Sequence, residues 1–353
     1  DGKEYYTLET NENGEITADL PEGLYKAVEV QAPEKYELEG QVYYFGIGTS
    51  REPQEEYIAT QAMTIGGGQN DIIKSVTPTS DGGIVAVGVY KSPKIEIDGI
   101  VIENTSDANW NDIDDVFMVK FDEKGKAEWI NTIEGEIHQS EQFNSVIETN
   151  DGGIVVAGGF RNTIKLEDQI IEGNYYSDGI LIKYTSEGKL EWYKVVGNVD
   201  EFDYFEYVTL ANDGGIIAVG DFNGDVEIEG NTITNKGNLI IKYNSDGILE
   251  WTKSTSIGVS EIEITDNNEM IIVGNYSDTI EIGGEKIQSN GSNGGVVIKC
   301  DELGKIEWAK VIGEEYDDCI SSVATTAEGD IIIGGYFSDD SIEIEGEIIK
   351  NEG

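Results

Sequence analysis

A short pattern that returns along the chain constrains the fold more than any other feature of the sequence. In its first copy, residues 119–129, an apolar residue, a lysine and an aromatic residue lead into a glycine-containing turn, after which a glutamate and a tryptophan follow. The later copies are residues 182–192, 241–251 and 298–308, the last with Cys300 in place of the aromatic residue. Two short alternating stretches around such a turn are typical of a β-hairpin. Repeated hairpins are therefore expected to build most of this chain.

Each copy of the pattern carries a lysine and a glutamate at the same spacing. If the hairpin folds symmetrically about its turn, the lysine faces the glutamate across the two strands, and Val119 shares the opposite face with Trp129. Opposite charges across a strand pair stabilise it by about 0.2–1 kcal/mol. We therefore interpret these charges as structural and not as catalytic. The expected pairs are Lys120 with Glu128, Lys183 with Glu191, Lys242 with Glu250, and Lys299 with Glu307.

The hairpins belong to a longer repeat, because their tryptophans recur at intervals of about 60 residues. Before each hairpin come a short first strand, a turn that reads Asp-Gly-Gly in three copies, an apolar second strand ending near glycine, and a small hairpin with alternating isoleucines. Four core strands are therefore expected in each repeat. The repeat units are predicted near residues 57–121, 127–184, 189–243, 248–300 and 305–353.

A single four-stranded sheet cannot cover both of its faces, so units of this kind must stack on their neighbours. Radial stacking of twisted four-stranded sheets gives a β-propeller, in which each sheet is one blade. We predict an all-β fold in which residues 57–353 form four complete propeller blades and partial ones, with residues 56–65 as the outer strand of a further blade. These repeats resemble those of uncharacterised propeller proteins on bacterial surfaces.

Residues 1–50 lack the repeat and contain short strands separated by Asn-Gly and Pro-Glu-Gly turns. Three of their segments resemble successive motifs of the Cna B-type (SpaA-like) domain, a small β-sandwich of Gram-positive surface proteins and pilins, namely residues 10–16, 20–25 and 29–38. The resemblance implies a partial β-sandwich at residues 1–50, followed by a polar linker at 51–56. Glu29 matches the glutamate that promotes an isopeptide bond in that family. The bond-forming lysine strand and asparagine have no match here, so an ordinary strand residue is the alternative for Glu29.

The charge of the chain excludes some classes of partner. Its formal net charge is −47, since 70 Asp and Glu residues outnumber 23 Lys and Arg residues. Such a field repels phosphate backbones and anionic membrane surfaces, so we predict no nucleic-acid partner. No apolar run approaches the roughly 18 residues needed to span a bilayer, so no membrane insertion of this segment is expected. The sequence begins at Asp1 without methionine, and we interpret it as a piece of a longer protein.

The two edges of the predicted propeller differ in sequence. One edge carries the short turns within the blades, which are uniform, whereas the opposite edge carries connections that vary between copies, and loops on a rigid scaffold are where function usually lies. Two of these connections combine acidic and aromatic residues, which suit a stacked sugar, a basic protein or a cation. The alternative is that the acids are merely solvated while Phe202 or Tyr316 packs under a blade. The candidate ligand-binding residues are Asp200, Phe202, Asp203, Tyr204, Glu315, Tyr316 and Asp317.

One acidic loop, residues 107–115, is the best candidate for a metal site. Oxygen-bearing side chains at alternate positions can surround a hard cation, and the order is similar to that of calcium loops. The loop lacks the glycine at the sixth position and the terminal glutamate of such loops, so an acidic loop without metal is the alternative. Calcium is the one cofactor considered. The candidate ligands are Asp107, Asn109, Asn111, Asp112 and Asp115.

No catalytic motif is recognisable in the sequence. His138 is the only histidine, and it cannot be joined to a Ser/His/Asp or Cys/His set. Cys300 and Cys319 are expected a strand length apart, as mostly buried thiols that form no disulfide. We therefore predict a non-enzymatic, extracellular binding or adhesion module, attached to the cell wall or surface through regions outside this chain, that holds a protein or glycan at its variable edge. A glycan-processing enzyme that uses carboxylates of that edge and a passive spacer are the alternatives.

Overall fold

The computed structural model of the chain divides into two compact units, Asp1–Ala62 and Met63–Gly353. The division falls later in the chain than the end predicted for the first domain at residue 50. The units are described separately below. The structure describes residues 23–28, 42–47 and 63–350, apart from 105–114, 136–140, 199, 223, 235–236, 283–284, 313–317, 327–328, 338–340 and 345–346.

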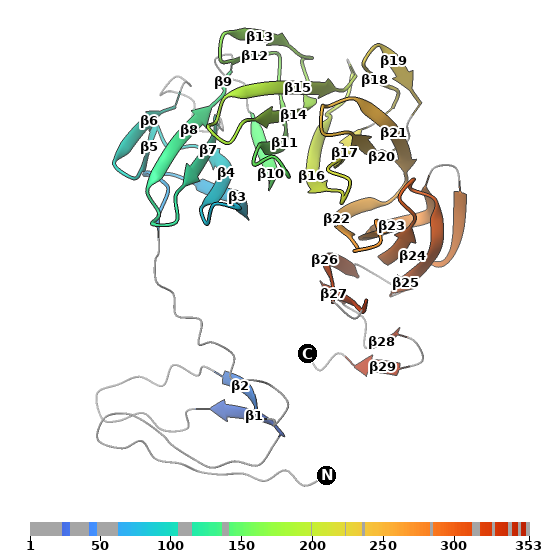
Figure 1. Cartoon of the computed structure of the whole chain (residues 1–353). Helices are drawn as coiled ribbons and strands as arrows, with labels where there is room; N and C mark the ends of the chain where they lie inside the picture. The colour runs from blue at the N-terminus through green and yellow to red at the C-terminus, as the bar shows by residue number, and fades with distance from the viewer. Residues whose placement is uncertain are drawn as a thin grey trace, which may run out of the picture. The chain divides into compact units, whose positions relative to one another are not determined.

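The described residues of the first unit form one antiparallel strand pair, β1 (Gly23–Val28) with β2 (Val42–Ile47) (Figure 1). Both strands lie within the region predicted to form a partial β-sandwich. Glu29 and the predicted linker at 51–56 lie outside the described residues, so the isopeptide and linker hypotheses stay predictions.

Antiparallel sheets of four strands build the second unit, and its described residues contain no helix. In each sheet the first strand pairs with the second, the second with the third and the third with the fourth, as the repeat predicts. This confirms the all-β fold and the four-strand repeat. Sheet 1 contains β3 (Asp71–Pro78), β4 (Ile84–Tyr90), β7 (Asp115–Phe121) and β8 (Ala127–Thr132); sheet 2 contains β10 (Gln142–Glu148), β11 (Ile154–Phe160), β14 (Asp178–Tyr184) and β15 (Leu190–Val196); sheet 3 contains β16 (Tyr204–Leu210), β17 (Ile216–Phe222), β20 (Gly237–Tyr243) and β21 (Leu249–Thr255).

The later sheets depart from this arrangement in two ways. Sheet 4 contains β22 (Gly258–Ile264), β23 (Met270–Ile282), β24 (Glu285–Cys300) and β25 (Ile306–Ile312), and its two long strands continue into the small hairpin. Because of this extension, Ile282 of β23 pairs with Thr255 of β21, and this single pair joins sheets 3 and 4. Sheet 5 pairs β26 (Cys319–Thr325) with β27 (Ile331–Tyr336). The separate small hairpins are β5 (Lys94–Ile97) with β6 (Ile100–Glu103), β12 (Thr163–Leu166) with β13 (Gln169–Glu172), β18 (Val226–Ile228) with β19 (Asn231–Ile233), and β28 (Ser341–Ile344) with β29 (Glu347–Lys350); β9 (Glu134–Gly135) pairs with β12.

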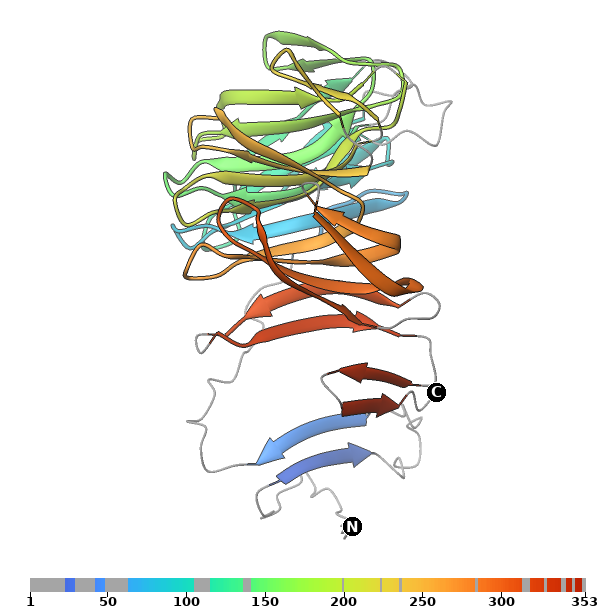
Figure 2. The ribbon, with the colours of Figure 1, turned by 90° about the vertical axis from the view of Figure 1, so that its right-hand side faces the viewer.

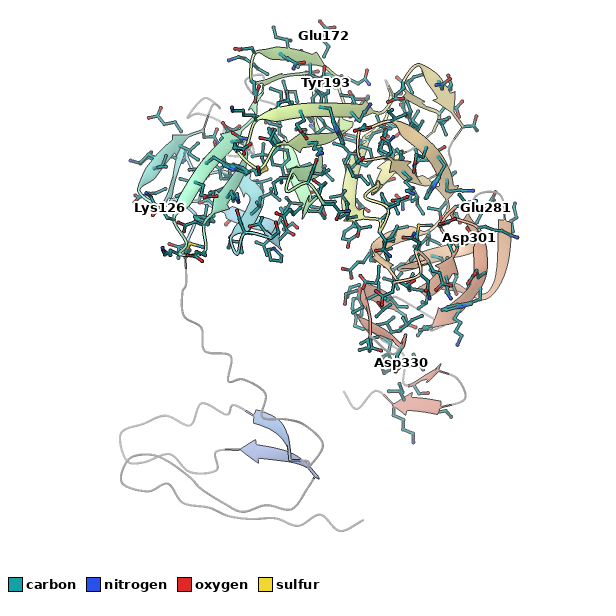
Figure 3. The ribbon with its side chains drawn as sticks, viewed as in Figure 1. Lys126, Glu172, Tyr193, Glu281, Asp301 and Asp330 are labelled. Carbon is teal, nitrogen blue, oxygen red and sulfur yellow. The ribbon has the colours of Figure 1, made fainter. Side chains whose placement is uncertain are left out.

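The sheets of the second unit follow one another around an arc, with their first strands side by side (Figure 1). Figure 2 shows them as successive layers, and side chains fill the spaces between the layers (Figure 3). Because side chains alternate along a strand, each apolar second strand serves two junctions. Val156 of β11 packs toward sheet 1, whereas Val155 and Ala157 pack toward sheet 3. Burial of each such side chain stabilises the stack by about 1.5–3 kcal/mol.

The turn of each repeated hairpin shifts the strand register by one residue from the predicted one. Gly125 closes the first of these turns with a φ of 75°, in the left-handed region. A glycine in that conformation creates a bulge, which adds one residue to one strand. In the backbone register Lys120 consequently lies opposite Trp129, which was predicted opposite Val119, and not opposite Glu128. The expectation of a symmetric hairpin was wrong, and the other three hairpins show the same shift.

The segment predicted as the outer strand of a further blade is described only at its end. Ile65 packs against the core of sheet 1, and Gly66 forms a bridge with Glu96 of the small hairpin. Gly197, at the end of the fourth strand of sheet 2, forms the same kind of bridge with Glu227. Ile65 and Gly66 therefore lie beside the small hairpin of sheet 1 as the end of the fourth strand of sheet 2 lies beside the small hairpin of sheet 3.

Candidate functional site

The edge of the sheets that carries the turns between first and second and between third and fourth strands is called the uniform edge. In sheet 2, Lys183 of β14 lies there between two carboxylates. Its Nζ is 2.7 Å from Asp151 Oδ2, in the first turn, and 3.1 Å from Glu191 Oε2, on β15. The lysine side chain is 5% exposed, whereas that of Asp151 is 58% exposed. This lysine clamp, an acid–lysine–glutamate set, thus ties the first turn to the hairpin.

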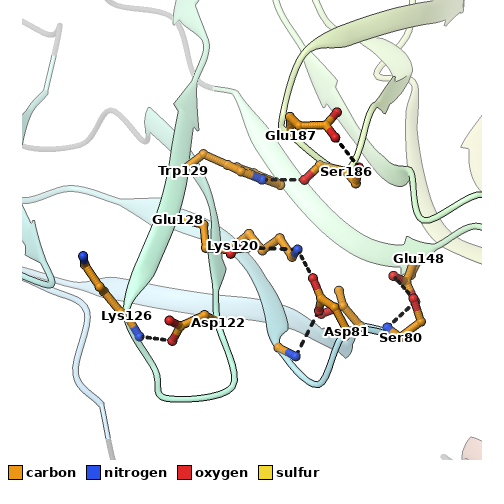
Figure 4. Close-up of polar contacts among 12 residues, drawn as sticks. Ser80, Asp81, Lys120, Asp122, Lys126, Glu128, Trp129, Glu148, Ser186 and Glu187 are labelled. Carbon is orange, nitrogen blue, oxygen red and sulfur yellow. Dashed lines mark hydrogen bonds and ion pairs between the residues drawn. The ribbon is translucent and has the colours of Figure 1, made fainter.

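The other complete sheets contain equivalent clamps, so each predicted lysine–glutamate pair is present. Each clamp also has a second acid that the sequence analysis did not connect with the lysine. A signal was available, because Asp-Gly-Gly recurs in the turns that supply the aspartates. Lys120 contacts Asp81 and lies 2.9 Å from Glu128 (Figure 4); Lys242 lies 2.5 Å from Asp213 and 3.1 Å from Glu250; Lys299 lies 2.6 Å from Glu269 and 3.3 Å from Glu307.

The aspartate of the clamp also holds its own turn. Oδ1 of Asp151 accepts hydrogen bonds from the Thr149 hydroxyl at 2.5 Å and from the Gly153 N–H at 3.2 Å, while its other oxygen receives Lys183. In sheet 2 one aspartate therefore both closes the short turn and holds the buried lysine. The same structural role explains why Asp-Gly-Gly recurs in the first turns of sheets 1, 2 and 3, whereas the first turn of sheet 4 supplies Glu269 to its lysine.

The clamps perturb the acidity of their members. The hydrogen bond from Lys120 lowers the pKa of Asp81 to about 2. Burial opposes the same effect at Asp151, but the hydrogen bonds from Lys183 and Thr149 still lower its pKa to about 2. Burial also works against the charged form of Lys183, yet Asp151 and Glu191 raise its pKa overall. All these groups are held in their charged forms at neutral pH, which suits an ion pair and does not suit acid–base catalysis.

The tryptophan of the hairpin joins neighbouring sheets. Trp129 of sheet 1 donates from Nε1 to the Ser186 carbonyl of sheet 2 at 2.9 Å (Figure 4). Gly188, in the same turn, lies so close to the indole ring that an added Cβ would be 2.8 Å from it. Gly247 of sheet 3 faces Trp192 of sheet 2 in the same way. The uniform edge is therefore occupied by structural contacts.

The opposite edge, where third strands begin and the chain passes between sheets, is called the variable edge. Next to sheet 2 it carries four side chains that we call the aromatic patch: Arg161, Tyr175, Tyr176 and Phe202. The rings of Tyr175 and Tyr176 are 5.4 Å apart, and those of Tyr176 and Phe202 are 5.1 Å apart, both edge to face. The Arg161 guanidinium lies 5.0 Å from the centre of the Phe202 ring. Three different connections thus bring one aromatic surface together.

The aromatic patch is exposed. The exposed fractions are 73% for Tyr175, 36% for Tyr176 and 46% for Phe202. An exposed apolar surface bordered by polar groups is typical of an interaction site. Ring faces can stack on a sugar or a protein side chain, and a cation over a ring adds about 0.5–1 kcal/mol at an exposed site.

Buried carboxylates hold the loops beneath the patch. Asp178, at the start of β14, accepts hydrogen bonds from the Asn174 backbone N–H at 2.5 Å and from its side-chain amide at 2.6 Å. Asp203, just before β16, accepts one from the Asn198 N–H at 2.7 Å. The Asp203 N–H donates to the Ser177 carbonyl at 3.2 Å, which links the two loops. The patch is therefore presented by anchored backbone.

The predicted ligand-binding residues have different places in this structure. Phe202 is exposed in the patch, and Asp200 is exposed beside it. Asp203 is 0% exposed, so it supports the loop and does not face a ligand. Tyr204 is half-buried, and burial raises its pKa, as do Glu206 and Asp221. Arg161, Tyr175 and Tyr176 were missed, although the adjacent tyrosines are visible in the sequence.

Other predicted residues lie outside the described part of the chain, and their roles stay predictions. Of the predicted calcium ligands only Asp115 is described; it is buried at the start of β7, and burial together with this carboxylate raises the pKa of Tyr90. Among the described residues no group of three or more His, Cys, Asp and Glu side chains is arranged to hold a metal. Residues outside the description are Asp107, Asn109, Asn111, Asp112, His138, Glu315, Tyr316 and Asp317.

Two carboxyl groups of the variable edge have raised pKa values, whereas the clamp aspartates have lowered ones. Burial raises the pKa of Asp178 despite its hydrogen bonds to Asn174. Burial and the neighbouring Asp221 raise the pKa of Glu206, on β16.

The prediction for the thiols is confirmed, because Cys300 is buried, Cys319 is partly buried and no disulfide joins them.

Comparison with known proteins gives one family match. Residues 1–61 match the family model of the SpaA prealbumin-like fold domain, which agrees with the resemblance of residues 1–50 and extends it. No curated protein matches the chain. Among solved structures it is similar to a protein of unknown function from Bacteroides caccae, with 8% identity over 77% of this chain and 86% of that one and a TM-score of 0.35. A protein of unknown function from Dyadobacter fermentans shares 11% identity over 74% of each chain, with a TM-score of 0.37.

In the part of the chain that the structure describes, no helix combines the length and the apolar character needed to cross a membrane.

Proposed function

We propose that this chain is a non-enzymatic binding module of an extracellular Gram-positive surface protein, and that its ligand docks on the aromatic patch. The observation that carries the proposal is the cluster of three exposed aromatic side chains on loops anchored by Asp178 and Asp203. Binding residues commonly lie on loops that a rigid scaffold holds in place, and the two buried carboxylates hold these loops. The match of residues 1–61 to the SpaA family supports the extracellular location.

We infer that the stack of sheets is part of a β-propeller. The support is the repeated four-strand order and the arc in which the first strands lie next to one another (Figure 1). In this arrangement the uniform edge gives rigidity through its clamps, and the variable edge presents the ligand-binding loops of several blades. The patch fits a glycan or a protein surface, since ring faces and one guanidinium recognise both.

The test compares binding of the chain and its patch variants to a glycan array and to proteins from host and matrix extracts. We expect Tyr175→Ala combined with Phe202→Ala to weaken binding at least about tenfold, which corresponds to about 1.4 kcal/mol. The matched control is Ile170→Ala, which removes an equally exposed apolar side chain from the adjacent hairpin; Ile170 is 71% exposed.

Three outcomes would contradict the proposal. Binding that is unchanged in the double variant would place the ligand elsewhere. Absence of any ligand in either assay would instead favour a passive spacer. Turnover of a polysaccharide, abolished by a single carboxylate substitution, would favour the glycan-processing alternative.

A further inference from the structure

Arg161 is the one cation of the aromatic patch, and in the structure it contacts a ring and not an acid. The sequence contains two arginines, Arg51 and Arg161, so Arg161 is the only arginine of the second unit. Its guanidinium lies 5.0 Å from the centre of the Phe202 ring. Among the described residues no carboxylate forms an ion pair with it, although acids outnumber bases by 70 to 23 in the chain.

Lys194, on β15, provides a comparison, because it also lies over a ring. Its Nζ is 5.6 Å from the centre of the Tyr243 ring, but it is also 2.6 Å from Glu229 Oε1. The clamp lysine of sheet 2 likewise lies between two carboxylates. These cations are already neutralised by acids of the same chain. The N–H donors of Arg161 are accepted by no carboxylate of the described residues, and they are therefore available to a ligand.

Backbone contacts set the position of the arginine relative to the rings. The residue after the arginine, Asn162, donates from its N–H to the Asn174 carbonyl at 2.8 Å, and its own carbonyl accepts from the Gly173 N–H at 2.5 Å. The two tyrosines of the patch directly follow Asn174 in the chain. The bridge between Ser177 and Phe202 adds the third segment. The cation and the three rings thus lie on segments whose backbones are joined to one another.

We propose that the ligand of the aromatic patch is a glycan whose terminal sugar carries a carboxylate, and that Arg161 binds this carboxylate. The inference rests on the proposed function of the patch and adds the chemical class of its ligand. The fork of N–H donors on a guanidinium matches the two oxygens of a carboxylate. The exposed rings of Tyr175 and Phe202 offer apolar faces on which a sugar ring stacks, and the tyrosine hydroxyls bond to sugar hydroxyls.

The charge of the chain favours a small acidic sugar over an acidic protein. The net charge of −47 repels polyanions and acidic proteins, and the exposed Asp200 and Glu201 lie close to Phe202 in the sequence. A protein partner covers about 800 Å² on each side of an interface, so an acidic one would bring many like charges together. One acidic sugar is small enough to contact the guanidinium and the rings alone. A basic partner would instead meet the like charge of Arg161.

The experiment measures binding of the whole chain to oligosaccharides that end in glucuronic, galacturonic or N-acetylneuraminic acid. Each acid is compared with its methyl ester, in which the same sugar lacks the charge. We expect the native chain to bind at least one acid at least about tenfold more tightly than its ester. Arg161→Met removes the guanidinium, so this variant should bind the acid and the ester equally. It should still bind the ester as the native chain does, which verifies that the rings are in place.

Lys165→Met is the charge-matched control, because it removes an exposed cation from the neighbouring hairpin and should leave the preference for the acid unchanged. The inference is overturned if none of the acids binds, if acids and esters bind equally to the native chain, or if Arg161→Met keeps the preference. A neutral glycan or a protein whose binding depends on Tyr175 and Phe202 would overturn it while the proposed function of the patch stands. Binding that ignores Tyr175→Ala combined with Phe202→Ala would overturn both.

Discussion

Lys120, Lys183 and Lys242 each lie between an aspartate and a glutamate on the uniform edge, whereas the aromatic patch on the variable edge combines residues of sheet 2 and of its connection to sheet 3. The clamps bury their lysines and serve the fold of each sheet separately. The patch exposes its rings, and none of them belongs to a core cluster of the described residues. In a repeat protein, a pattern present in every unit reports a structural requirement, and a departure from the pattern is where a specific function is expected.

If the uniform edge is structural, the largest loss of stability is expected from a substitution at Gly188. Gly188→Ala forces a side chain into the left-handed region at a φ of 75° and against the Trp129 ring. We expect a loss of about 2–4 kcal/mol in the free energy of unfolding, measured with denaturant. The control Gly99→Ala has a φ of 78° but open space around its Cβ. It should cost only about 1 kcal/mol. Equal losses would show that the tryptophan contact contributes nothing.

A smaller effect is expected from breaking one clamp. Lys183→Met leaves the Asp151 and Glu191 carboxylates together without their cation, and we expect a loss of about 1–2 kcal/mol in the free energy of unfolding. The variant should also lose less stability on acidification than the native chain. Lys189→Met, in the exposed turn of the same hairpin, should change stability by less than about 0.5 kcal/mol. Equal stability of the two variants would show that the clamp does not stabilise the uniform edge.

The two edges should respond to acid in opposite directions. Asp81 and Asp151 have pKa values lowered from 3.8 to about 2, so the stability they contribute is complete above pH 3.8 and is lost as pH falls toward 2. Burial and Asp221 raise the pKa of Glu206. Its ionised form therefore opposes folding at neutral pH, and this cost disappears as pH falls through the raised pKa toward 4.5, the ordinary value.

The smallest change in stability is expected at Glu206, and it tests the opposite response of the two edges to acid. Glu206→Gln removes a charge whose cost is present only above its raised pKa, so we expect the variant to gain at most about 1 kcal/mol at pH 7 and nothing at pH 4. Unfolding measured at several pH values checks this, with the exposed Glu201→Gln as control. A gain of equal size at both pH values would mean that ionisation of Glu206 is not the cause.

Much of the fold could be predicted because its determinants are local. Alternating apolar residues, glycine turns and their regular return identified the strands and their order within each sheet. The lysine–glutamate pairs could be predicted because both residues belong to one hairpin. The strand register could not be predicted correctly, since it depends on the conformation of Gly125, and a glycine accepts both a symmetric turn and a bulge.

The candidate site could be predicted only in part. Phe202 was identified from its acidic and aromatic surroundings, but its neighbours Tyr175 and Tyr176 come from another connection. The bridge between Ser177 and Phe202 brings the two connections together. The burial of Asp203 could not be predicted either, because an aspartate in a polar loop has the same sequence context whether it is solvated or holds the backbone.

By itself, the sequence determined the repeat, the strands, the charged hairpin pairs and the acidic character of the chain, because these follow from composition and from spacing within a few residues. Only the tertiary structure decided which distant residues meet. It placed Asp81 on Lys120, an arginine on Phe202, and Val155 against the next sheet. It also left Ile73, Val76 and Ile332 exposed. The physical reason is that burial and contact are properties of how sheets stack, and the same apolar strand is core or surface according to whether a neighbour covers it.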